Sequence, residues 1–424
     1  MGDLCVRLRG KKWGGLFSRA LLLFITSPFW ALTAKPLWAD SSHINICDRG
    51  VFGQIIADAL RQPCHQVSLQ SMQSQKILAI TARYRLEEIP EGAFSGLIQL
   101  TELSIYDNGI RRIAPGAFQG LQSLRSLEVS YNQLENLEPG TLRGLHQLRR
   151  LSLTGNRIHS LDPQVFRDTP QLTGLDLSHN KLFHLKIRGF EPLGQLRSLD
   201  LQNNVLEDIA PGAFLGLDSL LSLNLSHNSL TYLCPRRLDG LNSMVSLSAT
   251  HNLIENIFPG TFVGLELLTV VNLSYNFLQR IRAGTFKGLN SRSHFISLWL
   301  SHNFIVTIEP GAFEGLYALK NLHLDHNAIE SLETNAFLGL DSLHKVNLSF
   351  NELPLVRAEM LQGLFSLREL NLEGNRIQEL GDRAFAELFR IERLSLHNNP
   401  INRLSLEMVG LPRRVEVLGL EVLP

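Results

Sequence analysis

The sequence predicts an α/β-type repeat solenoid, and two observations support that prediction. The phrase L-x-x-L-x-L-x-x-N-x-L, seen for example from Leu124 to Leu134, returns every 24 residues with a single step of 27. A block of turn residues with one large apolar residue returns with the same period. A fixed period of this size is typical of stacked structural repeats. The asparagine of each phrase marks the register: Asn108, Asn132, Asn156, Asn180, Asn204, Asn228, Asn252, Asn276, Asn303, Asn327, Asn351, Asn375 and Asn399.

The first half of each repeat predicts a short strand. Its L-x-L core alternates inward and outward, as residues on a strand do. One strand per turn gives a parallel sheet whose neighbouring strands lie about 4.8 Å apart. The asparagine follows at the bend, where its amide can hydrogen-bond to backbone groups of adjacent turns. We therefore interpret the asparagine ladder as structural.

The second half of each repeat predicts a turn on the opposite side of the solenoid. It reads like residues 113–121, I-A-P-G-A-F-Q-G-L, in which Pro and Gly favour a turn. One large residue recurs in a fixed column, which we interpret as core rather than as a ligand site. The column contains Phe94, Phe118, Leu142, Phe166, Phe190, Phe214, Leu238, Phe262, Phe286, Phe313, Phe337, Leu361 and Phe385.

The two halves together resemble the leucine-rich repeat in its 24-residue typical form. The resemblance covers residues 78–424, with about 13 full repeats, and a fourteenth strand is expected at Val417–Leu420. It implies a curved horseshoe with a concave parallel sheet and short turns or 3-10 segments on the convex side. It also implies binding or scaffolding without catalysis. No motif such as G-x-S-x-G or H-E-x-x-H is present in the sequence.

Residues 1–39 read as a signal peptide. A basic start precedes an apolar stretch from Ala20 to about Ala34, and Ala39 before Asp40 offers a cleavage point. The apolar run is short and interrupted for a membrane span, so an uncleaved signal anchor is the weaker alternative. This layout predicts a secreted or cell-surface protein, which in a bacterium means the periplasm or the extracellular space.

Residues 40–77 predict a helical N-terminal cap. Cys47 and Cys64 flank residues 51–60, in which Val51, Ile55, Ile56 and Ala59 recur as on one helix face. A disulfide between the two cysteines would hold that helix over the first repeat, which otherwise exposes its core. This arrangement resembles the caps of secreted bacterial leucine-rich repeat proteins. Cys234 is left over, and either a buried thiol or a bond between molecules would account for it.

Charge argues against a nucleic-acid partner. The whole chain has 40 basic and 40 acidic residues. Removing residues 1–39 leaves 34 basic against 39 acidic residues, and no basic cluster remains. Nucleic-acid binding requires such a cluster to neutralise phosphates. We therefore expect a protein or another surface macromolecule as the partner.

A partner-binding site is predicted around the one tryptophan that points out of the sheet. The outward column between the core leucines is small and polar except at Trp299 and His323. Exposed tryptophan is enriched at binding hot spots. Alternatively, the residues around Trp299 only cover the backbone of the loops. The single 27-residue step, at Asn290–His294, lies beside these residues. The predicted site contains Trp299, Phe277, Phe304, Leu253, Tyr275, Val270, His302, His323 and His326.

No metal site or cofactor is predicted. Histidines recur just before the asparagine, with His227/His251 and His302/His326 on adjacent turns. Stacked imidazoles could bind a metal, but no acidic column accompanies them. The predicted function is therefore an extracellular, non-catalytic recognition scaffold acting through the concave face. A structural cell-envelope assembly protein and a truncated receptor ectodomain are the alternatives.

Overall fold

The computed structural model describes residues 46–81, 86–289 and 295–423. The chain divides into two compact units, with the division between Met72 and Gln73. The predicted signal peptide, residues 1–39, and the longer step at residues 290–294 lie outside the described residues.

The first unit contains the predicted cap helix. Helix α2 covers nearly all of the predicted range 51–60, and the elements of this region are η2 (Ile46–Arg49), α2 (Val51–Ala59), η3 (Cys64–Gln66) and α3 (Leu69–Ser74). Cys47 in η2 and Cys64 at the start of η3 form a disulfide with a Cα–Cα distance of 5.3 Å. The cross-link therefore closes the chain around α2.

The buried face of α2 differs from the predicted one. Phe52, Ile55 and Ile56 are buried, as is expected of a helix stripe. Val51 was predicted on the same face, but its side chain is exposed. The prediction for Val51 was wrong because the first helical residue lies at the edge of the stripe, where Phe52 supplies the larger apolar surface.

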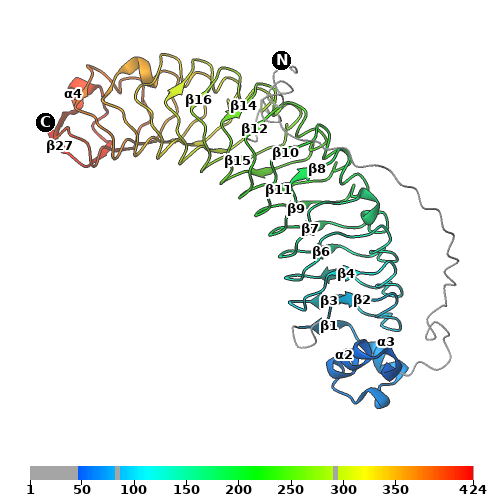
Figure 1. Ribbon diagram of the computed structural model, residues 1–424. Coiled ribbons are helices and arrows are strands. Elements are labelled where there is room, and N and C mark those ends of the chain that lie inside the picture. The colour runs from blue at the N-terminus through cyan, green and yellow to red at the C-terminus, as the bar shows by residue number, and fades with distance from the viewer. Residues whose placement is uncertain (1–45, 82–85, 290–294, 424) are drawn as a thin grey trace, which may run out of the picture. The chain divides into compact units, whose positions relative to one another are not determined.

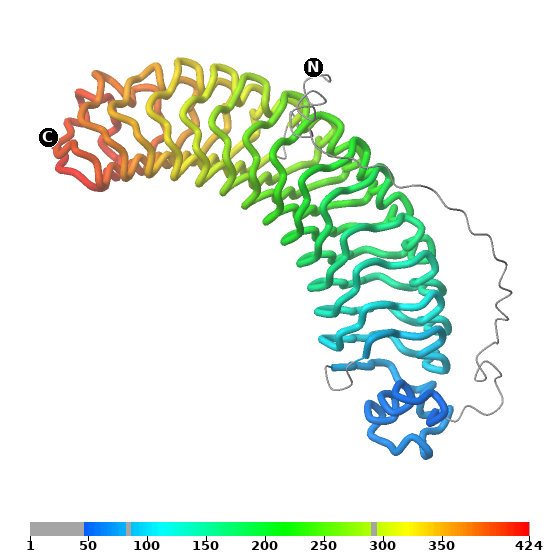
Figure 2. Tube along the Cα trace, viewed as in Figure 1, coloured from blue at the N-terminus to red at the C-terminus, as the bar shows by residue number. Residues whose placement is uncertain are grey.

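The second unit is the predicted solenoid, which is confirmed. Its inner side is one parallel sheet of 15 strands, visible along the concave side of this unit in Figures 1 and 2. The strands, in order across the sheet, are β1 (Ile77–Ile80), β3 (Glu102–Ile105), β5 (Ser126–Glu128), β6 (Arg150–Ser152), β7 (Gly174–Asp176), β9 (Ser198–Asp200), β11 (Ser222–Asn224), β13 (Ser246–Ser248), β15 (Val270–Asn272), β17 (Ser297–Trp299), β19 (Asn321–His323), β20 (Lys345–Asn347), β22 (Glu369–Asn371), β24 (Arg393–Ser395) and β26 (Glu416–Leu418).

Strand register follows the repeat register. Each strand pairs with the same positions of the next repeat, so that Asn272 on β15 lies beside Trp299 on β17, which lies beside His323 on β19. The central residue of each of these strands points into the core, and Leu298 is fully buried. Its two neighbours on the strand, Ser297 and Trp299, face outward. A residue of any one repeat position therefore forms a straight row across the sheet.

The asparagine ladder closes the bend after each strand. Asn276 shows the pattern: its Nδ2 donates to Ala249 O of the preceding repeat at 2.9 Å and to Leu273 O at 3.0 Å. Its Oδ1 accepts from the Ile254 amide at 3.1 Å. All thirteen asparagines donate to a carbonyl of the preceding repeat. The side chain thus satisfies buried backbone groups that a bend leaves unpaired.

The return path of each repeat consists of turns, short parallel strand pairs and a few helical turns. The strand pairs are β2 (Glu88–Ile89) with β4 (Arg112–Ile113), β8 (His184–Leu185) with β10 (Asp208–Ile209), β12 (Tyr232–Leu233) with β14 (Asn256–Ile257), β16 (Arg280–Ile281) with β18 (Thr307–Ile308), β21 (Leu355–Val356) with β23 (Glu379–Leu380), and β25 (Arg403–Ser405) with β27 (Glu421–Leu423). The helical turns are η5 (Pro163–Phe166), η6 (Ala358–Leu361) and α4 (Leu406–Val409).

The core is filled from the convex side by the phenylalanine column. Phe286 is fully buried, and its ring stacks on Phe262 and on Phe313 with centroids 5.9 Å apart in both cases. Leucines interrupt these stacks where the sequence places them in the same column. Cys234 is also buried here, with 2 % of its surface exposed.

The end of the solenoid contains the predicted fourteenth strand. It is β26, which pairs with β24 through Val417 opposite Leu394. It is the fifteenth strand of the sheet because β1 precedes the strand of the first full repeat. Across the described ranges, the structure has no helix with the length and apolarity that a membrane crossing requires.

Candidate partner-binding surface

Trp299 and His323 form a stacked pair on the concave face. Trp299 ends β17, where the strand alternation turns its side chain outward and leaves 38 % of it exposed. His323 occupies the same row on β19, and the two rings are nearly parallel with centroids 3.7 Å apart. The imidazole thus supports one face of the indole. Sequence reasoning placed both residues in the site, and the structure brings them into direct contact.

The strands before Trp299 form a flat and uncharged floor. From β11 to β15 the outward positions carry small or medium side chains without charge: Ser222, Asn224, Ser246, Ser248, Val270 and Asn272. Val270, predicted as part of the site, is the one apolar residue among them and pairs with Ser297 of the Trp299 strand. Trp299 therefore forms a step at the end of a smooth surface about three strands wide.

Charged residues border this floor on both sides. Asp176 and Asp200 lie in the same outward row on β7 and β9. Burial raises the pKa of Asp200, and the neighbouring charge of Asp176 raises it further. Hydrogen bonds from the Gln202 amide and the Asn224 side chain lower this pKa and so oppose the shift. On the other side, Lys345 on β20 pairs with Glu369 on β22 at 2.9 Å. The uncharged region is thus confined to the middle of the sheet.

A second feature lies at the bend after the strands, where six rings form a continuous stack. We call this the ring stack, and it contains His227, His251, Tyr275, His302, His326 and Phe350. Adjacent centroids lie 4.1 to 4.6 Å apart. Sequence reasoning placed Tyr275, His302 and His326 in the site but missed Phe350, although Phe350 precedes its asparagine as the others do.

Backbone geometry explains why histidine recurs in this column. The residue before the ladder asparagine has a positive φ in every repeat, for example 53° at His302 and 55° at His326. Asn, Asp, His and Gly tolerate this left-handed conformation best, and the column also contains Asn203, Asp107 and Gly155. The histidines thus have a structural reason to be there, which the spacing of the asparagines did not reveal.

The remaining predicted residues form a short apolar row just after the asparagines. Phe277 and Phe304 stack with centroids 5.4 Å apart, and Leu253 occupies the same column one repeat earlier. All three are exposed. The nine predicted residues are thus distributed over four parallel rows: the two outward rows of the strands, with Val270 in one and Trp299 and His323 in the other, the ring stack, and this apolar row.

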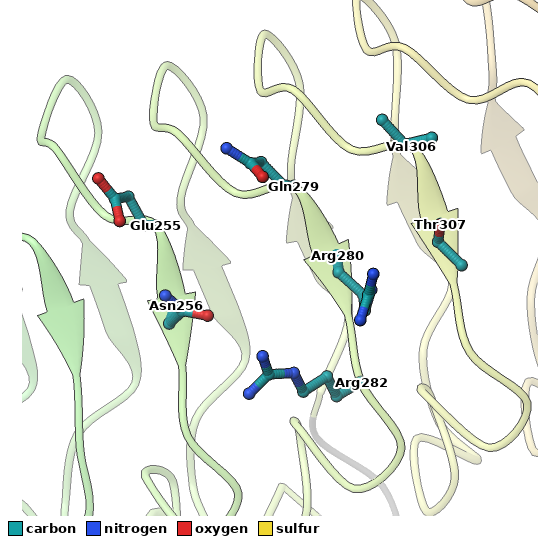
Figure 3. A pocket seen from close by; sticks show the side chains of 7 residues that line it. All are labelled: Glu255, Asn256, Gln279, Arg280, Arg282, Val306 and Thr307. Carbon is teal, nitrogen blue, oxygen red and sulfur yellow. The ribbon is translucent and has the colours of Figure 1, made fainter. Parts of the chain in front are cut away.

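An open depression continues beyond the apolar row. Figure 3 shows it between successive repeats, where it has a volume of about 420 Å³ and is lined by Glu255, Asn256, Gln279, Arg280, Arg282, Val306 and Thr307. The side chain of Arg282 extends toward the repeat that contains Asn256. Its polar lining distinguishes it from these rows, and sequence reasoning did not single out its residues.

Burial favours the neutral form of two imidazoles at this surface, His323 and His251. Burial lowers the pKa of His323, Lys345 lowers it further, and Asp325 opposes both. Burial also lowers the pKa of His251, and so do the nearby His227 and His302. A neutral imidazole stacks on its neighbours without adding charge.

Acid is expected to destabilise the ring stack. Because folding lowers the pKa of His251, the unfolded chain binds more protons, and this contribution to stability is lost as pH falls through the ordinary histidine value of about 6.5 and below. Thermal unfolding should show a lower Tm at pH 5 than at pH 7.5, and the drop should be smaller in His251→Asn. His146→Asn, outside the ring stack, is the control and should keep the full drop. Equal drops in all three proteins would contradict the prediction.

Comparison with known proteins agrees with this architecture. The family model described as leucine rich repeat matches residues 76–134, 98–158, 123–182, 146–206, 194–254, 246–295, 294–353 and 365–421. These matches span most of the chain, so the protein belongs to the leucine-rich repeat family. A search of curated proteins finds no match.

Similar solved structures come from animals and from bacteria. Toll of Drosophila, solved in complex with Spatzle, has 24% identity and a TM-score of 0.71 over 82% of this chain and 47% of its own. The chain thus spans about half the length of that Toll chain. A leucine-rich repeat protein of Leptospira interrogans has 29% identity and a TM-score of 0.63, over 80% of this chain and 83% of its own. An internalin of Listeria monocytogenes has 19% identity and a TM-score of 0.58, over 82% and 96%.

Proposed function

We propose that this leucine-rich repeat protein is an extracellular, non-catalytic recognition scaffold that binds a partner protein through its concave face. The observation that carries the proposal is the Trp299–His323 stack, which projects from an otherwise smooth and uncharged floor. A large aromatic side chain supported on one face is already ordered before binding, so little conformational entropy is lost when a partner covers it. Aromatic anchors of this kind dominate the energetics of protein interfaces.

The chemistry of the surface favours a protein over a charged polymer. The outward positions from Ser222 to Trp299 carry no formal charge. Nucleic acids and sulfated polymers are bound mainly through basic side chains, which these rows do not provide. A partner with an apolar or uncharged contact region fits the floor, and the exposed Phe277 and Phe304 extend the apolar contact beyond the bend. Toll with Spatzle and LRIM1 with APL1C were solved as complexes, so this fold accommodates protein partners.

Loss of the tryptophan is expected to abolish capture of the partner. Immobilised wild-type protein and Trp299→Ala would be exposed to surface and secreted proteins, and retained proteins identified by mass spectrometry. A partner retained by wild type should be lost or weakened at least about 30-fold by Trp299→Ala, because hot-spot residues contribute about 2 kcal/mol or more. The Tm should be unchanged because the side chain points away from the core.

Tyr317→Ala provides the matched control. Tyr317 lies on the turn after Phe313, off the concave sheet, and is at least as exposed as Trp299. Its removal should leave capture intact. Retention of the partner by Trp299→Ala, or equal loss in both variants, would refute a binding site centred on the tryptophan.

A further inference from the structure

A carboxylate stands beside one pair of histidines in the ring stack. His302 and His326 lie on adjacent repeats with ring centroids 4.1 Å apart. Asp325 directly precedes His326, and its Oδ2 lies 3.3 Å from His326 Nδ1. One ligand atom from each of the three residues lies within 4.8 Å of those of the other two. Asp325 is a single residue rather than one of a column of acidic residues, and for that reason the sequence did not predict a metal site here.

The spacing is close to that of a tetrahedral metal site. Zinc binds imidazole nitrogen and carboxylate oxygen at about 2.0–2.1 Å, which places neighbouring ligand atoms about 3.4 Å apart. The Asp325–His326 contact already has this separation. The widest pair would have to close by about 1.4 Å. Because an imidazole binds a metal ion in the plane of its ring, His326 would also have to rotate out of the stack, which its exposed position permits.

Neighbouring side chains orient the carboxylate and keep the two imidazoles together. The Ser301 hydroxyl donates to Asp325 Oδ1 at 2.8 Å, which leaves Oδ2 to face the imidazoles. Tyr275 stacks on the outer face of His302 at 4.2 Å, and Phe350 stacks on the outer face of His326 at 4.6 Å. The two imidazoles are thus kept side by side, and an outer hydrogen bond of the Ser301 type fixes the carboxylate of a metal site.

We propose that His302, Asp325 and His326 bind a zinc ion, with the fourth coordination position open to solvent. Two imidazoles and a carboxylate are a donor set that zinc accepts, and three protein ligands leave one position for water or for a group from another molecule. The zinc site shares His302 and His326 with the partner-binding surface. Zinc binding does not need the partner, because every ligand and supporting residue belongs to this chain.

The chain contains its own comparison site. His227 and His251 stack with centroids 4.2 Å apart, almost the same spacing as His302 and His326. Ser226 and Thr250 precede these two histidines, so no carboxylate occupies the place that Asp325 has in the other pair. If stacking alone were enough to bind zinc, both pairs would bind it.

The substitutions can be chosen to preserve the backbone. Asparagine occupies the same left-handed column at Asn203 and Asn398, with φ of 52° and 56°, so His302→Asn leaves the bend unstrained. Serine occupies the Asp325 column at Ser301 and Ser349 of the neighbouring repeats, so Asp325→Ser copies a residue that the fold already accepts. A double His227→Asn and His251→Asn variant removes the comparison pair.

Titration calorimetry of the full chain with zinc chloride tests the proposal. Wild type should bind one ion, His302→Asn and Asp325→Ser should each weaken binding at least tenfold, and the double variant should bind as wild type does. Cobalt(II) should give the strong visible absorption of four-coordinate ions in wild type and in the double variant only. Circular dichroism verifies that each variant is folded.

Several results would overturn the assignment. The first is that wild type does not bind zinc. The others are that Asp325→Ser binds zinc with unchanged affinity, or that the His227 and His251 double variant loses zinc binding. As a further readout, Ser301→Ala should weaken zinc binding several-fold, because the Ser301 hydroxyl orients Asp325 without binding the ion itself. The stoichiometry should stay at one zinc ion per chain.

Discussion

Replacement of Phe286 by alanine is expected to lower the free energy of unfolding by about 3–5 kcal/mol, the usual cost of truncating a buried phenylalanine. The ring has no exposed surface and stacks on Phe262 and Phe313. The repeat spacing is set by the strand pairing on the other side of the core, so the neighbours cannot close the cavity. Chemical denaturation followed by circular dichroism measures the loss.

Leucine at the same position is the control for this prediction. Leu142, Leu238 and Leu361 occupy the phenylalanine column in other repeats and are buried there. Phe286→Leu should therefore cost much less than Phe286→Ala. Equal losses in the two variants would show that the stacked rings, rather than the filled volume, stabilise this part of the core. Because each repeat contacts only its neighbours, the alanine variant should also unfold locally around Phe286 first.

Replacement of Asn276 by alanine is expected to lower the free energy of unfolding by about 2–4 kcal/mol. A buried donor left without an acceptor costs about 1–3 kcal/mol, and further hydrogen bonds are lost with the side chain. The Ile254 amide would lose its acceptor, Asn276 Oδ1. The carbonyls of Ala249 and Leu273 would each keep a hydrogen bond, because Asn252 donates to the first and Asn303 to the second. The main penalty is thus one buried N–H group.

The exposed Asn242 provides the comparison for the ladder. Asn242→Ala should change the free energy of unfolding by no more than about 0.5 kcal/mol, as surface substitutions usually do. Hydrogen exchange at Ile254 should become faster in Asn276→Ala because its amide is no longer bonded to a side chain. Unchanged protection at Ile254 would contradict the role assigned to the ladder.

The fold could be predicted from the sequence because the residues that determine it recur in every repeat. Strand, bend and core column each recur with the period of the asparagines, so errors in one repeat are corrected by the others. The helix around Ile55 could also be predicted from its apolar spacing, but it occurs once, and Val51 was placed on the wrong face. The periodic signal is thus strong where it repeats and weak where it does not.

The candidate surface could be predicted only in part. Trp299 and His323 were found because they break a small, polar column. Their contact at 3.7 Å could not be predicted, because it depends on side-chain rotamers and on the rotation between repeats. Asp325 was missed for a related reason: it is the one aspartate in a column that is mostly serine and threonine, and it matters only beside His326.

The left-handed position before each asparagine has a consequence for how such a surface can change. Asparagine, aspartate, histidine and glycine exchange there at little backbone cost, and the position returns in all thirteen repeats. The solenoid therefore has a row of positions at which these residues can replace one another, and this row is separate from the residues that hold the coils together. A row of imidazoles can be lengthened, interrupted or moved along the protein one repeat at a time, and the leucine core need not respond.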